Sequence, residues 1–188
     1  MNSPDRASIK IRPARIDDAE GIGKVHVDSW RSTYRDIVPD EVLNRLSVET
    51  RAAKWREIIG AAGSSDHTFV AVDSDERIIG FANSGANRSK EFPFKGELNA
   101  IYLHEEFQGQ GIGRRLFDES IAALGGDGFV DALIWVLEQN PACRFYERMG
   151  AKACGEKMET MGGKPLKEVA YGWTKNSGNV STGQTQQS

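Results

Sequence analysis

The stretch that decides the fold reads Gln108-Gly109-Gln110-Gly111-Ile112-Gly113-Arg114-Arg115. It follows a strand pattern at Glu97–Leu103 and opens a helical pattern at Ile112–Leu124, which Gly125 and Gly126 close. A continuous apolar run at Ala132–Leu137 then predicts a strand that is covered on both faces. Strand, helix and strand in this order predict a crossover unit whose two strands pair in parallel.

The alternating glycines of this stretch predict an anion site. Gly109, Gly111 and Gly113 let backbone amides come close to a ligand, and the helix that follows begins with unpaired N–H groups and the positive end of its dipole. Together these features favour phosphate or diphosphate, with Arg114 and Arg115 adding positive charge. The alternative is a turn that only shapes the start of the helix. The spacing does not match a dinucleotide-binding turn, and no nucleoside-triphosphate loop motif occurs.

Patterns on either side of the crossover unit predict a mixed sheet. Ile9 and Ile11 alternate with charged residues and predict a short strand that Pro13 ends. Helices are expected from Asp17 or Asp18 through Trp30, over Ser47–Ile59 with Ser47 as N-cap, and from Asn140 to Met149; strands are expected at 68–72 and 77–83 as a hairpin, and at 153–160 and 166–173. Because most of these connections are hairpin-like, we expect an α/β (α+β) fold with a mostly antiparallel sheet.

Composition indicates one globular domain. The 188 residues are 39% hydrophobic and 27% charged, and the net charge is −3. We predict a domain over residues 8–173 and a disordered tail over 174–188, in which Val180 is the only strongly apolar residue. No apolar run is long enough for a membrane helix, no basic block indicates nucleic acid as a partner, and two cysteines make no disulfide framework. These features predict a cytoplasmic protein.

Two motifs resemble the GNAT superfamily of acyl-CoA-dependent N-acetyltransferases. Gln108 to Gly113 fits the motif Q-x-x-G-x-G after a strand, and Asn140 to Gly150 fits N-x-x-A/C-x-x-F-Y-E-x-x-G after the next strand. The likeness spans about Ile9 to Trp173 and is strongest over Glu97–Lys152. It implies a GNAT-like fold with one central splayed parallel strand pair, flanking helices, and acetyl-CoA as co-substrate.

The resemblance also implies where the acyl donor binds. The backbone of Ile101, Tyr102 and Leu103 would pair with the pantetheine arm, and the Leu103 amide would polarise the thioester carbonyl. Asn140 would hydrogen-bond the same arm, although its position before Pro141 also suits a helix cap. The diphosphate site would comprise Gln108, Gly109, Gln110, Gly111, Ile112, Gly113 and Arg114.

Two residues are candidates for proton transfer. Glu97 lies eleven positions before Gln108, a spacing similar to that of the catalytic glutamate in histone-acetylating members, and would act as a base through water. Tyr146 matches the general acid tyrosine of the family; its phenol is protonated at neutral pH and can donate to the leaving thiolate. The alternatives are a solvent-facing strand carboxylate for Glu97 and a core aromatic for Tyr146.

The acceptor is expected to be a small-molecule amine. Trp30 and Tyr34 lie four residues apart and would present an aromatic face to it, or else fasten their helix to the sheet. The three histidines and two cysteines show no metal-ligand spacing, so no metal is expected. A protein N-terminus or lysine remains open as acceptor, as does a non-catalytic acyl-CoA sensor, although Glu97 and Tyr146 favour an enzyme. Relatives of this type are often homodimers.

Overall fold

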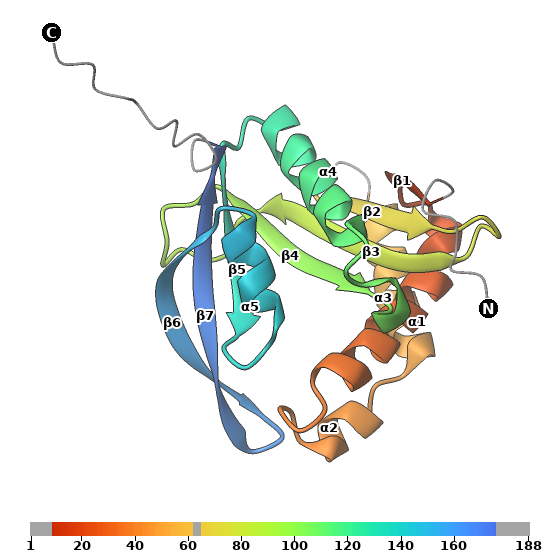
Figure 1. Cartoon of the computed structure of the whole chain (residues 1–188), viewed down its shortest axis with the longest axis horizontal. Helices are drawn as coiled ribbons and strands as arrows, with labels where there is room; N and C mark the ends of the chain where they lie inside the picture. The colour runs from red at the N-terminus through yellow and green to blue at the C-terminus, as the bar shows by residue number, and fades with distance from the viewer. Residues whose placement is uncertain (1–8, 62–64, 176–188) are drawn as a thin grey trace, which may run out of the picture.

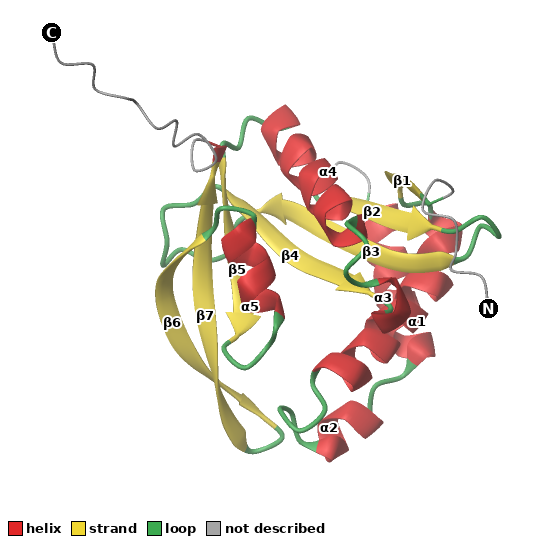
Figure 2. Ribbon diagram, in the orientation of Figure 1, coloured by secondary structure: helices red, strands yellow, loops and turns green. Residues whose placement is uncertain are grey.

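A single seven-stranded sheet organises the computed structural model, which describes residues 9–61 and 65–175 (Figures 1 and 2). The strands lie in the order β1-β2-β3-β4-β5-β7-β6. The strands are β1 (Lys10–Pro13), β2 (His67–Val72), β3 (Ile78–Ala86), β4 (Gly96–Leu103), β5 (Asp131–Leu137), β6 (Lys152–Met161) and β7 (Lys164–Thr174). The helices are α1 (Ala19–Thr33), α2 (Asp40–Asn44), α3 (Val48–Gly60), α4 (Ile112–Gly126) and α5 (Ala142–Arg148), with short 3-10 turns at Ile16–Asp18 and Glu105–Phe107.

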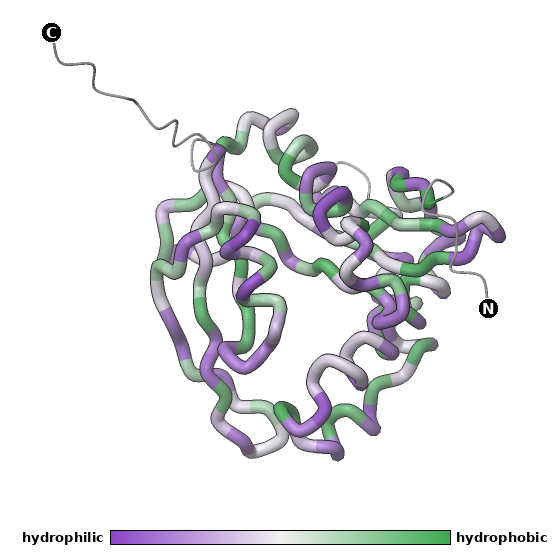
Figure 3. Tube along the Cα trace, viewed as in Figure 1, coloured by the Kyte–Doolittle hydropathy of each residue, from purple (hydrophilic) through white to green (hydrophobic). Residues whose placement is uncertain are grey.

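Helices cover both faces of the sheet. In Figure 1, α4 and α5 lie on one face, and α1 and α3 lie on the other. The buried side chains follow this division: Leu116 of α4 packs with Ala82 and Leu103, whereas Ile22 and Val25 of α1 pack with Phe81. Figure 3 shows the hydrophobic strands at the centre and a hydrophilic turn between β2 and β3.

The predicted elements are present, with three local differences. Ser47 caps α3 by accepting a hydrogen bond from the Thr50 N–H at 3.3 Å. The expected helix end at Gly125 is wrong, because α4 continues through Gly126 and the left-handed residue that follows it is Gly128, with φ of 86°. The short helix α2 was not predicted from the sequence. The proposed tail falls outside the described residues from residue 176 onward, whereas Thr174 still belongs to β7.

The strands β4 and β5 separate after a short parallel contact, which confirms the splayed pair. They are paired only at Gly96↔Ala132 and Glu97↔Leu133, although β4 continues to Leu103. Gly96 permits this contact because it has no Cβ. A Cβ there would lie 2.7 Å from the Asp131 carbonyl oxygen, which is too close without a shift of the backbone. Beyond it, the edge of β4 that faces β5 has no strand partner among the described residues, so its backbone groups must find other hydrogen-bonding partners.

Candidate active site

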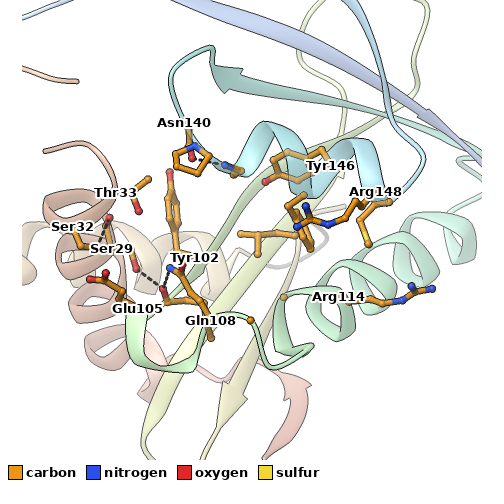
Figure 4. A pocket seen from close by; sticks show the side chains of 18 of the residues that line it. Ser29, Ser32, Thr33, Tyr102, Glu105, Gln108, Arg114, Asn140, Tyr146 and Arg148 are labelled. Atoms are coloured by element: carbon orange, nitrogen blue, oxygen red, sulfur yellow. Dashed lines mark hydrogen bonds between the residues drawn. The ribbon is translucent and has the colours of Figure 1, made fainter. Parts of the chain in front are cut away.

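A cavity of about 660 Å³ opens where β4 and β5 separate (Figure 4). Its walls come from α1, the end of β4, the glycine-rich loop and α5. Polar groups at its lining include Ser29, Ser32, Thr33, Tyr102, Glu105, Gln108, Arg114, Asn140, Tyr146 and Arg148, and the backbone of Ile101, Leu103, Gly109, Gly111 and Gly113 also borders it. The cavity therefore brings together most of the residues that the two sequence motifs singled out.

The glycine-rich loop supplies free backbone donors to this cavity. Gly109 and Gly111 have φ of 71° and 83°, a left-handed conformation that side chains disfavour. Gly111 is the N-cap of the 15-residue helix α4, and no side chain caps its amides. An anion at this end would therefore meet unpaired N–H groups and the positive end of the helix dipole.

Two residues of the predicted diphosphate site do not line the cavity. Gln110 turns away and donates from Nε2 to the Glu106 carbonyl at 3.0 Å. Ile112 is buried in the core against Leu116 and Phe107. Their side chains shape the loop from outside, and any contact of theirs with the ligand would come from the backbone.

The backbone of Leu103 is held in a fixed orientation. The His104 N–H bonds the Ile79 carbonyl of β3 at 3.0 Å, so by strand alternation the N–H and C=O of Leu103 point into the gap. The Leu103 carbonyl accepts hydrogen bonds from Ser29 Oγ at 3.4 Å and from Gln108 Nε2 at 3.1 Å. The carbonyl is thus satisfied, and the N–H remains as the donor that faces the cavity.

Helix α5 and the turn before it contribute Tyr146 and Asn140 to the opposite wall. Asn140 precedes the helix; its Oδ1 accepts from the Ala142 N–H at 2.9 Å, and its Nδ2 donates to the Tyr34 hydroxyl at 3.1 Å. The amide therefore performs the helix-capping function expected at this position. Tyr146 is buried, and burial raises the pKa of its phenol, which stays protonated.

The structure places Trp30 and Tyr34 behind the cavity wall, where neither lines the cavity. Their rings make an edge contact with centroids 4.8 Å apart, and Trp30 Nε1 donates to the Tyr102 hydroxyl at 2.9 Å. Tyr34 is 7% exposed. These contacts fasten α1 to the sheet, which is the alternative that the sequence left open, and direct contact with an acceptor stays a prediction.

Glu97 lies at the other end of β4 from the cavity. It occupies the last parallel pair with β5 and is not among the cavity residues. Its carboxylate accepts a hydrogen bond from the Arg88 N–H at 3.1 Å and lies 3.5 Å from Arg88 Nε. A base function at this distance requires a water path, and it stays a prediction.

Several cavity residues were not anticipated. Ser29, Ser32 and Thr33 share one face of α1 through their spacing of three and four residues, a signal that the sequence carries. Arg148 stands at the end of α5 on the same side of the cavity as Arg114 in Figure 4. The cavity is therefore cationic beside α4 and α5, and it carries hydroxyls and Glu105 beside α1.

The described residues, 9–61 and 65–175, contain neither a cluster of metal-ligating side chains nor a helix that could span a membrane. No group of three or more histidine, cysteine, aspartate or glutamate side chains is arranged to hold a metal ion there. Within the same part of the chain, no helix has the length and apolar character needed to cross a membrane.

Comparison with known proteins identifies the family. A family model described as the acetyltransferase (GNAT) family matches residues 27–151. The chain belongs to the GNAT family of acetyltransferases. It is 40% identical over 165 residues to an uncharacterized N-acetyltransferase of Bacillus subtilis strain 168, a match that covers 88% of this chain and 92% of that protein.

Other GNAT relatives agree with this assignment. A spermidine N(1)-acetyltransferase of Thermoplasma acidophilum is 28% identical over 148 residues, covering 77% of this chain and 89% of that protein. The crystal structure of PaiA N-acetyltransferase from the same organism, in complex with coenzyme A, matches with a TM-score of 0.63 and 26% identity over 86% of this chain and 98% of that one. As a GNAT member, the chain is an acetyl-CoA-dependent N-acetyltransferase.

Proposed function

We propose that the protein transfers an acetyl group from acetyl-CoA directly to a primary amine of a small molecule. The observation that carries this proposal is that the unpaired edge of β4 and the glycine-rich loop border the same cavity. An extended arm with amide groups suits the unpaired edge, and a diphosphate suits the loop. Coenzyme A combines both in one molecule.

The donor-binding residues follow from this arrangement. The backbone of Ile101 and Leu103 faces the gap and would pair with the pantetheine arm, and the amides from Gly109 to Arg114 would hold the diphosphate. The free Leu103 N–H would donate to the thioester oxygen, where charge develops when the amine attacks. A fixed donor of this kind commonly stabilises the transition state by about 3 kcal/mol.

Proton transfer completes the reaction. The amine must be neutral to attack and loses a proton as the C–N bond forms, whereas the thiolate gains one as the C–S bond breaks. Tyr146 lines the cavity as a protonated phenol and would donate to the sulfur. Glu97 would accept the proton of the amine through water.

The groups on the α1 side of the cavity are suited to binding a small amine as the acceptor. Ser32, Thr33 and Glu105 lie together there in Figure 4, away from Arg114 and Arg148. Hydroxyls and a carboxylate can receive the N–H groups of an amine. The name of the spermidine N(1)-acetyltransferase relative agrees with an amine acceptor.

A panel of monoamines, polyamines, amino acids and peptides tests the proposal, with release of free CoA as the readout. We expect turnover with small amines and little with peptides. Glu105→Gln should raise KM for the accepted amine and leave KM for acetyl-CoA unchanged. Glu106→Gln is the matched control, because the neighbouring carboxylate does not line the cavity. CoA release with peptides alone would favour a protein acceptor, and CoA binding without turnover would contradict the proposed function.

A further inference from the structure

One face of helix α5 is turned toward the start of α4. Phe145, Arg148 and Met149 are spaced by three and four residues, so they share a face, and all three line the cavity. The Phe145 ring lies beside the first turn of α4, because a Cβ added to Gly113 would be 3.6 Å from it. This face of α5 therefore borders the cavity next to the glycine-rich loop.

Arg148 carries the unpaired charge on this face. Within residues 9–61 and 65–175 its guanidinium forms no hydrogen bond or ion pair, whereas Arg114 Nε on α4 lies 3.6 Å from Asp118 Oδ2. In Figure 4 the Arg148 side chain points from α5 back across the cavity, and that of Arg114 points away from it. A free guanidinium is well suited to a phosphate group, because its planar set of N–H donors can bind two phosphate oxygens at once.

Coenzyme A offers more than one phosphate to such a group. In the proposed function its diphosphate binds the backbone amides of the glycine-rich loop, and a further phosphate is attached to the 3′ position of the adjoining ribose. Beyond the loop, the cavity leads either toward α1 or toward α5. The α1 side carries the Glu105 carboxylate, which repels a phosphate. The α5 side offers Arg148 and the apolar surface of Phe145 and Met149, so charge directs the 3′-phosphate to Arg148.

We propose that Arg148 binds the 3′-phosphate of the donor and makes the protein select coenzyme A thioesters over thioesters that lack this phosphate. The disfavoured donors include thioesters of dephospho-coenzyme A and of the phosphopantetheine arm of a carrier protein. The inference rests on the proposed function, because the ribose reaches α5 only when the arm lies on the β4 edge and the diphosphate on the loop. No bond is made or broken at Arg148, so this residue contributes to donor affinity and not to the chemical step.

Calorimetric titration of the wild-type protein and Arg148→Gln with two ligands tests this inference. Dephospho-coenzyme A keeps the pantetheine arm, the diphosphate and the adenosine of coenzyme A, and it lacks only the 3′-phosphate. The wild-type protein should bind coenzyme A about fivefold more tightly than dephospho-coenzyme A, near the upper value for an exposed ion pair. Arg148→Gln should bind the two ligands with the same Kd. Arg144→Gln is the matched control and should keep the preference, because Arg144 is exposed on the same helix but does not line the cavity.

Ionic strength provides a second readout that a purely structural residue would not affect. The wild-type preference for coenzyme A should shrink at an ionic strength of about 1 M, where the Debye length is about 3 Å. Arg148→Gln should show no preference at low or at high ionic strength. A wild-type preference that stays unchanged in concentrated salt would arise from shape and not from charge, and it would contradict the function given to Arg148.

The outcomes separate this inference from the proposed function. If the wild-type protein binds both ligands equally, if Arg148→Gln still prefers coenzyme A, or if this variant loses affinity for both ligands to the same extent, Arg148 does not recognise the 3′-phosphate. The inference is then wrong, whereas release of CoA with an amine still supports the proposed function. If the wild-type protein binds neither ligand, both are wrong.

Discussion

Gly111→Ala isolates the contribution of the glycine-rich loop to donor binding. Gly111 has φ of 83°, and an added Cβ would meet no atom within 4 Å, so the effect must come from backbone conformation alone. A residue with a side chain costs about 1–2 kcal/mol in this conformation. If the loop relaxes to avoid that cost, its amides turn away from the diphosphate. Each hydrogen bond to a charged group is worth about 1.5–3 kcal/mol, so the Kd for coenzyme A should rise at least about 10-fold.

Calorimetric titration with coenzyme A measures this loss. Acetyl-pantetheine lacks the diphosphate. When it replaces acetyl-CoA as the acetyl donor, the variant and the wild-type protein should therefore turn over equally well. Gly125→Ala, near the other end of α4, is the matched control: its φ is not left-handed, an added Cβ would meet no atom within 4 Å, and it does not line the cavity. If Gly111→Ala binds coenzyme A with wild-type affinity, the amides of this loop do not hold the diphosphate.

Three more perturbations address the proposed acid Tyr146, the proposed base Glu97 and the buried histidine His26. Tyr146→Phe should lower kcat about 100-fold with little change in coenzyme A affinity, and unchanged turnover would remove its acid function. Glu97→Gln should flatten the acidic limb of the pH–rate profile, and an identical profile would exclude Glu97 as the base. His26 is 9% exposed, its Nδ1 accepts from Trp55 Nε1 at 3.2 Å, and burial lowers its pKa to about 3. Below about pH 6.5, His26 therefore binds a proton in the unfolded chain but stays neutral in the folded protein. The free energy of unfolding should fall with decreasing pH by up to about 1.4 kcal/mol per pH unit. Urea unfolding between pH 5 and pH 7 should show this slope in the wild-type protein and not in His26→Phe, and equal slopes would contradict the assignment.

The crossover unit could be predicted because its signals are local. A strand pattern, three glycines, a helical pattern and an apolar run follow one another within Glu97–Leu137, and each depends on neighbours in sequence. The same holds for Ser47, whose capping of α3 follows from its position before the helix. The end of α4 was missed because Gly125 and Gly126 can continue a helix as well as end it.

The site was harder to predict where it depends on long-range packing. The four-residue spacing of Trp30 and Tyr34 predicts a shared helix face, but it does not say whether that face meets the acceptor or the strand β4. The hydrogen bond from Trp30 to Tyr102 joins residues 72 positions apart, which no local pattern encodes. Likewise, the distance of Glu97 from the cavity depends on where β4 and β5 part, and that is set by the whole sheet.

The two-residue contact between β4 and β5 has a thermodynamic consequence for handling the protein. Any molecule that occupies the gap binds the folded chain and not the unfolded one, and so it shifts the unfolding equilibrium by mass action. At a donor concentration 100 times its Kd, the stabilisation is about 2.7 kcal/mol. A melting temperature measured for this chain is therefore meaningful only together with the concentration of acetyl-CoA in the sample.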